Sequence, residues 1–388
     1  MATTYKTFSN NDIVSTKTLL NEAIPLTGTV LSGTYMEGTS EVNIKNYAHG
    51  MFQSVYDYPY LSSSANHIFD LTMGYSSNSS LSASTSTQNA KKINIYNQMA
   101  KVLVGHSSSG DIQEFDEDGD LTGGTKIREA FFINMARLLT KDEIKKGSFT
   151  LELGVAPGLS ASFHQRIKLT DYNAQNDYRV NSPAGDYAVL YAETSYDGGT
   201  SANTLVHGAG SSGGTERVKA GLLYYQAGVA VVTASVFDHV SASSAHGGAS
   251  GGGILGDDIA AAALPVMGPD LGQYLLVNQM LTGSEISSSC NALRSRMYNM
   301  SFNNTTELNS TIYFCRMNHN EFNYSSNPTY LSGSKIRVKN VAGDTPVAYV
   351  TGVGLYSSDN ELMAVAKLSE PLKKDPTNEL TLRVRLDY

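Results

Sequence analysis

Tryptophan is absent from this chain of 388 residues, and cysteine is almost absent. The two cysteines, Cys290 and Cys315, are too few for a disulfide framework and lack the spacing of a metal site. We expect two reduced thiols, as in a protein assembled in the cytoplasm, although the two could pair. The cysteine content therefore excludes a small disulfide-stapled secreted domain.

Charged residues are also scarce. Asp, Glu, Lys and Arg make up 16% of the chain, against roughly 25% in an average globular protein. The formal net charge is −8, and the lysine pairs at 91–92 and 145–146 stand alone. A surface that binds nucleic acid through its phosphates needs clustered positive charge, so we expect no nucleic-acid partner.

Long apolar runs are missing as well. No run approaches the length that crosses a membrane. Residues 1–12 contain no apolar segment of the kind found in a secretory signal. We therefore expect neither a membrane partner nor secretion.

Small polar residues and tyrosine take the place of charge. The chain has 35 Gly and 23 Tyr, and it is rich in Ser, Thr and Asn. Tyrosine offers a large contact area at a small entropic cost, so such surfaces suit broad contacts between proteins. The alternative interpretation is an ordinary β-rich domain with solvated loops.

The order of the patterns predicts an α+β fold that is rich in β-structure and has three parts. Residues 1–147 are predicted to form an N-terminal α+β domain, and residues 148–256 a β-rich middle region with Gly/Ser loops. Residues 257–388 are predicted to form a C-terminal antiparallel β domain, either a sandwich or a sheet.

Apolar periodicity places the expected elements. Helices are predicted over 12–20, over 91–105 with a stop at Gly105, over 125–139, and for one further turn within 140–147. Strands are predicted from 148 onward, and residues 218–238 favour a buried hairpin, with a buried helix as the alternative. Residues 257–283 are expected to be partly helical, and the chain beyond 297 to return to short strands.

The stretch from 335 to 388 has the most regular pattern. Its four runs alternate apolar and polar residues and are separated by turn-forming residues, which predicts strands joined as hairpins. In the last run the residues Leu380, Leu382, Val384 and Leu386 share one face. One face should therefore meet a core, while the other is free for water or a partner chain.

Three acidic residues form the only metal candidate. Asp116, Asp118 and Asp120 resemble the start of a calcium loop. Position six of such a loop is Leu121 here instead of Gly, and position twelve is Ile127 instead of Glu. A solvated acidic loop is therefore the favoured interpretation.

Two other motifs match in sequence, but the elements predicted around them do not fit the sites that these motifs form. Residues 208–213 match GxGxxG, but the following run is predicted to be a strand, whereas a dinucleotide site needs a helix there. Residues 248–252 match GxSxG around Ser250, but a run of glycines replaces the strand-to-helix turn that a nucleophile needs. The histidines are scattered. We expect no cofactor and no enzyme; a hydrolase that uses Ser250 is the least favoured hypothesis.

Several long blocks carry a resemblance to a known family. They begin at residues 89 (NAKKINIYNQMAKVLVG), 115 (FDEDGDLTGGTKIREAFFINMARLLTKDEIKKGSF), 220 (AGLLYYQAGVAVVTASVF), 320 (NEFNYSSNPTYL) and 345 (TPVAYVTGVGLYSSDNELMAVAKLSEPLKK). These blocks resemble virion structural proteins of contractile-tailed bacteriophages of the cyanophage myovirus type. The resemblance covers the chain from about residue 65 onward and brings no catalytic residue with it.

The resemblance implies a structural component present in many copies, in the tail, baseplate or neck of a virion assembled in the bacterial cytoplasm. Its partners would be other virion proteins and copies of itself, as a homo-oligomer. The alternatives are a decoration protein of the capsid or neck collar, and a module that binds a receptor or glycan. The residues predicted to make contacts are Phe322, Tyr324, Tyr349, Tyr356, Leu382, Val384 and Tyr388.

Overall fold

The chain divides into two compact units. We call Met1–Leu20 with Glu307–Tyr388 the terminal unit, and Asn21–Thr306 the central unit. The computed structural model describes residues 5–27, 43–83, 85–156, 162–199, 205–206, 217–238, 253–255, 276–325, 331–332, 335–336, 343 and 345–388. The division into 1–147, 148–256 and 257–388 stays a prediction.

The prediction of a β-rich fold is confirmed, because a large antiparallel sheet dominates the structure. In the central unit its order is β15-β9-β10-β12-β13-β14-β7-β4-β3-β2. The strands are β2 (Ile44–Asn46), β3 (Gln53–Tyr56), β4 (His67–Tyr75), β5 (Phe115–Asp116), β6 (Lys126–Ile127), β7 (Glu129–Met135), β8 (Glu143–Ile144), β9 (Thr150–Gly154), β10 (Arg166–Thr170), β11 (Tyr178–Arg179), β12 (Tyr187–Tyr196), β13 (Val218–Tyr224), β14 (Val229–Thr233) and the first part of β15 (Met297–Met317).

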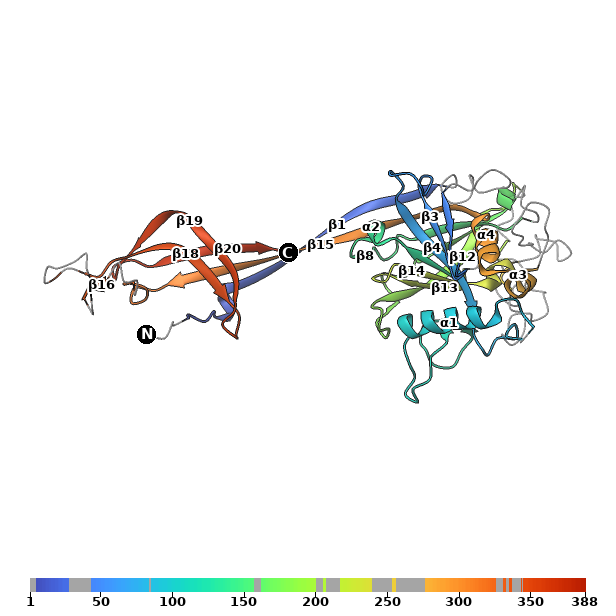
Figure 1. Ribbon diagram of the computed structural model, residues 1–388, viewed down its shortest axis with the longest axis horizontal. Helices are drawn as coiled ribbons and strands as arrows, with labels where there is room; N and C mark the ends of the chain where they lie inside the picture. The colour runs from blue at the N-terminus through green and yellow to red at the C-terminus, as the bar shows by residue number, and fades with distance from the viewer. Residues whose placement is uncertain are drawn as a thin grey trace. The chain divides into compact units, whose positions relative to one another are not determined.

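The central unit also contains helices, some of which pack on the sheet strands β4, β7 and β9 (Figure 1). They are α1 (Asn89–Leu103), α2 (Arg137–Thr140), η3 (Ser162–His164), η4 (Ala234–Phe237), α3 (Val277–Gly283) and α4 (Ile286–Arg294). Gly74 on β4 allows α1 to come close, since a Cβ there would lie 2.6 Å from the carbonyl oxygen of Lys92. The middle strands are buried on both faces, as the continuous burial of Phe131, Phe132 and Ile133 on β7 shows.

Two of the helix predictions are confirmed, and the hairpin is confirmed as well. The helix α1 occupies most of 91–105, and Gly105 follows it with a positive φ of 93°. The strands β13 and β14 pair antiparallel as a buried hairpin, with Gly228 at φ 68° in the turn between them. Helix α3 confirms the helical expectation at the end of 257–283, whereas 256–275 lie outside the described residues.

The other helix predictions are wrong. Where a helix was expected over 12–20, Asp12 ends the single turn η1 (Asn10–Asp12) and residues 13–20 belong to strand β1 (Ile13–Thr27). Residues 125–139 form β6, β7 and the start of α2, and the expected extra turn within 140–147 is the short strand β8. The wide apolar stripe that suggested a helix over 125–139 reflects a strand buried on both faces, which periodicity cannot separate from a buried helix.

The prediction of short strands beyond 297 is also wrong for the first part of this region, because β15 continues over 21 residues. This strand and β1 contribute to both units. In the terminal unit β15 pairs with β20 (Leu380–Asp387) from Ser310↔Asp387 to Met317↔Leu380. The remaining strands are β16 (Leu331–Ser332), β17 (Lys335–Ile336), β18 (Ala348–Tyr356) and β19 (Leu362–Lys374).

The predicted ladder of hairpins is therefore only partly correct. Strands β18 and β19 form a hairpin. Strand β20 pairs with the distant β15 instead of with β19, a pairing that spacing along the chain cannot reveal. The predicted alternation in β20 is confirmed, because its apolar residues are half-buried and its polar residues exposed.

Candidate functional site

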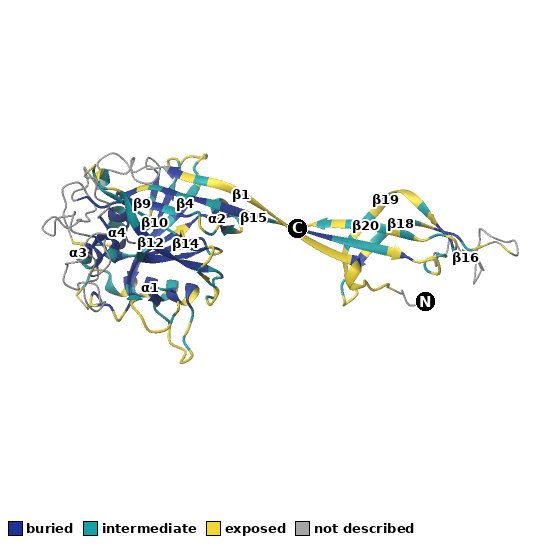
Figure 2. Cartoon of the chain, turned by 180° about the vertical axis from the view of Figure 1, so that it is seen from behind, coloured by how far each residue is buried: buried dark blue, intermediate teal, exposed yellow. Residues whose placement is uncertain are grey.

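The terminal unit has a thin apolar core. Its buried apolar residues in the described part of the chain are Met317, Val347, Ala348 and Leu355, and none joins the main core cluster. Exposed and half-buried residues cover most of its strands (Figure 2). An exposed apolar surface of this kind is typical of a protein that binds other proteins.

Exposed apolar side chains concentrate in the same unit. It holds 102 of the 388 residues but 15 of the 27 large apolar side chains that are exposed in the described part of the chain. They are Tyr5, Phe8, Ile13, Val14, Leu19, Leu20, Leu308, Phe322, Tyr324, Tyr349, Tyr356, Leu362, Met363, Val365 and Tyr388.

A cavity of about 510 Å³ lies inside the terminal unit, between residues 5–12, the end of β15, β18 and β20. Its lining includes the aromatic rings of Tyr5, Phe322 and Tyr356. The rings of Tyr5 and Tyr356 lie 4.6 Å apart between centroids, at a tilt of 47°. The cavity therefore offers aromatic faces that an apolar group or a sugar ring can contact.

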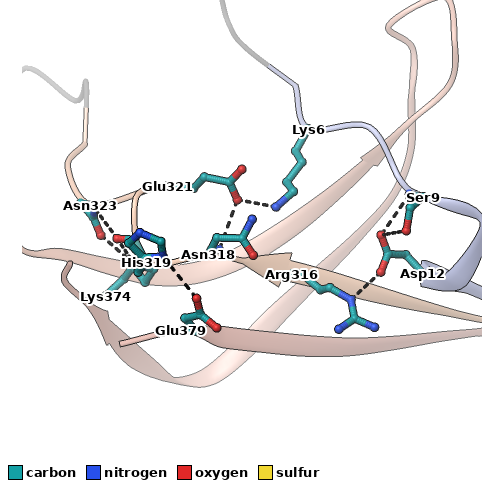
Figure 3. Close-up of polar contacts among 10 residues, drawn as sticks. All are labelled: Lys6, Ser9, Asp12, Arg316, Asn318, His319, Glu321, Asn323, Lys374 and Glu379. Carbon is teal, nitrogen blue, oxygen red and sulfur yellow. Dashed lines mark hydrogen bonds and ion pairs between the residues drawn. The ribbon is translucent and has the colours of Figure 1, made fainter. Parts of the chain in front are cut away.

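Hydrogen bonds to Asp12 hold the segment 5–12 in place. Asp12 accepts hydrogen bonds from the backbone N–H of Ser9 at 3.0 Å and from its hydroxyl at 2.7 Å, and from Arg316 Nε at 2.5 Å (Figure 3). The Ser9 hydroxyl and backbone N–H, with the Arg316 guanidinium, lower the pKa of Asp12 to about 2. Asp12 is therefore a carboxylate, and it fixes the chain that supplies Tyr5.

The loop of residues 318–325 presents Phe322. Lys374 is buried, and its Nζ donates to Asn323 Oδ1 at 2.7 Å (Figure 3). The same Nζ donates to the Asp375 carbonyl oxygen at 2.8 Å. On the other side of the loop Lys6 forms an ion pair with Glu321. The hydrogen bond from Lys6 lowers the pKa of Glu321, which keeps the Glu321 carboxylate ionised.

Phe322 itself has a φ of 54°, a left-handed conformation that a bulky side chain adopts only under constraint. Strain of this kind is found at functional sites, where the surrounding contacts enforce it. In this loop Lys374 and Lys6 bind the residues on either side of Phe322, which are Asn323 and Glu321. The Phe322 ring lines the cavity, while 46% of the residue stays exposed.

The structure brings the predicted contact residues into one unit but in different settings. Phe322, Tyr324, Tyr349, Tyr356 and Tyr388 are exposed. Leu382 and Val384 are half-buried on the inner face of β20, and Leu382 lines the cavity. Their role as an interface stays a prediction. Sequence reasoning missed the segment 5–12, whose rings carry no local pattern that points to β18.

The three acidic residues do converge. Asp116, Asp118 and Asp120 each place one carboxylate oxygen within 4.8 Å of the others. Lys126 already forms an ion pair with the buried Asp116, and burial raises the pKa of that carboxyl. A cation would have to displace Lys126. The loop's own backbone N–H groups also bind these carboxylates, with Thr122 donating to Asp120 at 2.7 Å.

One Ser, His and Asp cluster was not foreseen. Asp70 Oδ1 accepts from the Ser54 hydroxyl at 2.5 Å and lies 2.9 Å from His67 Nε2. The hydrogen bond to Asp70 raises the pKa of His67. In a nucleophilic relay the His stands between Ser and Asp. Here Asp70 stands between the other two, so the cluster does not activate Ser54. Ser250 and residues 208–213 lie outside the described residues.

No helix within the described residues is both long and apolar enough to cross a membrane. Comparisons with models of protein families, with curated proteins and with solved structures found no match.

Proposed function

We propose that this chain is a structural assembly protein of a tailed-phage virion, in the tail, baseplate or neck, and that it acts through contacts with other proteins. The observation that carries the proposal is the exposed apolar surface of the terminal unit, where 15 large apolar side chains surround a core of four buried ones. The blocks that resemble virion structural proteins support the same function.

A thin β unit with so little core gains stability when a partner covers its apolar surface. The aromatic rings at Tyr5, Phe322 and Tyr356 are of the type that dominates binding at interfaces. We infer that they are contact residues and that the strained Phe322 is presented for this purpose. Catalysis has no part in the proposal.

We also propose a finer description of the fold, with residues 1–147 as an α+β region and the terminal unit as a small sandwich. One layer would be β1, β15 and β20, and the other the β18–β19 hairpin. The cavity lined by Val350, Val353 and Leu382 would lie between the two layers. An incompletely filled interior fits a unit that completes its packing in an assembly.

The test is incorporation into particles. In phage particles produced with the wild-type chain, mass spectrometry should detect the chain, and immunogold labelling should place it on the tail, baseplate or neck. Phe322→Ala with Tyr356→Ala should reduce incorporation several-fold, because both rings are contact residues. Leu138→Ala is the control, since Leu138 is also an exposed apolar residue but lies in the central unit.

Absence of the wild-type chain from purified particles would refute the proposal. Labelling confined to the capsid or collar would favour a decoration protein. Deletion of residues 376–388 is a coarser variant, because it removes β20 and its pairing with β15; it should abolish incorporation.

The cavity supports a second candidate, a module that binds a receptor glycan. Sugar rings stack on tyrosine, and the lining combines Tyr5 and Tyr356 with polar Asp12, Arg316 and Asn360. A glycan array would separate the two functions: a glycan that binds the wild-type chain and not Tyr356→Ala favours this candidate.

A further inference from the structure

The cavity in the terminal unit has a mainly apolar wall. Five aromatic rings line it, and they belong to Tyr5, Phe8, Phe314, Phe322 and Tyr356. Aliphatic side chains of β18 and β20 line it as well. Its volume of about 510 Å³ lies within the roughly 300–1,000 Å³ that is typical of small-molecule sites. The body of a ligand that fits this cavity is therefore apolar.

Two glycines on β18 help to keep the cavity open. Gly352 and Gly354 line it and bring no side chain into it. The groups around this space lack contacts on one side, because the core of the terminal unit is thin. A ligand in the cavity would supply those contacts and would stabilise the folded unit by mass action.

The charged side chains of the wall decide which polar group the ligand can carry. Among the described residues these are Lys6, Asp12 and Arg316. Lys6 is already paired with Glu321. Asp12 is only 7% exposed and accepts three hydrogen bonds, two from Ser9 and one from Arg316 Nε. The carboxylate of Asp12 is therefore occupied by the protein itself.

Arg316 keeps free donors. Its Nε binds Asp12, whereas its two Nη groups have no hydrogen-bond partner within the part of the chain that the structure describes (Figure 3). The side chain is 51% exposed, so a ligand can reach it. A guanidinium binds a carboxylate through parallel N–H···O bonds, which are among the strong hydrogen bonds of proteins. The polar group that this cavity can bind is therefore a carboxylate.

We propose that the cavity binds a small apolar monocarboxylate, an aliphatic or aromatic acid. Its body lies among the aromatic rings, and its carboxylate pairs with the Nη groups of Arg316. Such binding goes beyond the proposed function, because it requires no other virion protein.

The same wall disfavours a neutral sugar and a cation. The hydroxyl groups of a sugar need acceptors, and Asp12, the one carboxylate among the described residues of the wall, is already bound. The charges of these residues are two positive and one negative, which opposes a cation and favours an anion. An apolar acid satisfies both the rings and the guanidinium.

The test is isothermal titration of the purified full-length chain at low salt. The probes are 4-phenylbutyrate and decanoate, one aromatic and one aliphatic acid. At least one should bind with a dissociation constant at or below about 1 mM. The neutral 4-phenylbutyramide, matched in size to 4-phenylbutyrate, should bind at least about tenfold more weakly than the acid, because it lacks the charge that Arg316 binds.

Variants separate the guanidinium from the apolar wall. Arg316→Gln should weaken the binding of 4-phenylbutyrate at least about tenfold and leave that of the amide unchanged. Arg383→Gln is the matched control, since Arg383 is exposed on the neighbouring β20 but does not line the cavity. Val353→Phe narrows the cavity and should weaken both ligands. Circular dichroism of each variant checks that the fold is retained.

Cys315 reports where the ligand binds, because it lines the cavity. At ten times the dissociation constant, 4-phenylbutyrate should slow the alkylation of Cys315 about tenfold. Cys290 lies in the central unit and should react at an unchanged rate.

Four results would overturn the inference. The first is the absence of binding by either acid up to about 10 mM. The second is equal affinity for acid and amide, and the third is an unchanged alkylation rate at Cys315. The fourth is displacement of 4-phenylbutyrate by a neutral glycan, which would favour the glycan candidate instead.

Discussion

Individual residues in this protein are placed by contacts from distant parts of the chain. Phe322 was foreseen as a contact residue, but its left-handed φ of 54° was not. Its two neighbours in the chain are bound by Lys374 and Lys6, which lie 52 positions after it and over 300 before it in sequence. A residue type in a loop can therefore suggest a role, whereas its geometry depends on partners that only the fold brings together.

Lys92 is a second residue of this kind. It is fully buried on α1, and its Nζ donates to the carbonyl oxygens of Leu281 at 2.6 Å and Ser284 at 2.7 Å. These carbonyls lie at the end of α3, where backbone acceptors have no partner within the helix. Burial lowers the pKa of Lys92 to about 8.

Lys92→Ala should lower the free energy of unfolding by about 3 kcal/mol, because it leaves a cavity and orphans buried carbonyls. Urea unfolding measures the change, and Lys101→Ala, exposed on the same helix, is the control. Between pH 8 and 10.5 the unfolded chain holds a proton that the folded Lys92 has released. Wild-type stability therefore gains a component that rises with pH in this range and that the variant lacks. Equal stability of both variants would contradict this role.

At the scale of elements, alternation predicts a strand most clearly where one face is buried, as in β20. In the hairpin β13–β14 both strands are almost wholly buried, so the sequence favoured the hairpin but left a buried helix as the alternative. The apolar pattern of β7 predicts a helix, because Phe131, Phe132 and Ile133 are all apolar and buried. The pattern of β1 also predicts a helix, although its Ile13-Val14 start and Thr residues favour a strand. Pairing with β15 decides its conformation.

The contact between α1 and β4 depends on one glycine. A Cβ at position 74 would lie 2.6 Å from the Lys92 carbonyl oxygen and 2.8 Å from the Tyr96 nitrogen, both in the backbone of α1. Gly74→Ala should therefore displace the helix and cost about 2–3 kcal/mol in the free energy of unfolding.

Thermal unfolding followed by far-ultraviolet circular dichroism measures this cost. Gly283→Ala serves as the control, since a Cβ there meets no atom within 4 Å. An unchanged midpoint in Gly74→Ala would show that α1 can shift without loss of packing.

At the scale of the whole molecule, the sequence predicted a β-rich chain but not a unit assembled from both ends. The terminal unit combines residues before position 21 with residues after position 306, so its core cannot be read from any single window. Its apolar residues are spaced along the sequence as regularly as those of the central unit. They are less buried because few layers cover them.

This difference predicts that the terminal unit opens first, and the two cysteines report it. Cys315 lies in the terminal unit and is half-buried, whereas Cys290 lies in the central unit and is fully buried. Burial raises the pKa of both thiols, that of Cys290 to about 12, so each reacts with an alkylating reagent only when its surroundings open.

In a urea series, peptide mass spectrometry should find Cys315 alkylated at lower urea than Cys290. The reason is that a unit with four buried apolar side chains has less to lose on unfolding. Coincident midpoints for both thiols in the wild type would show that the two units unfold as one.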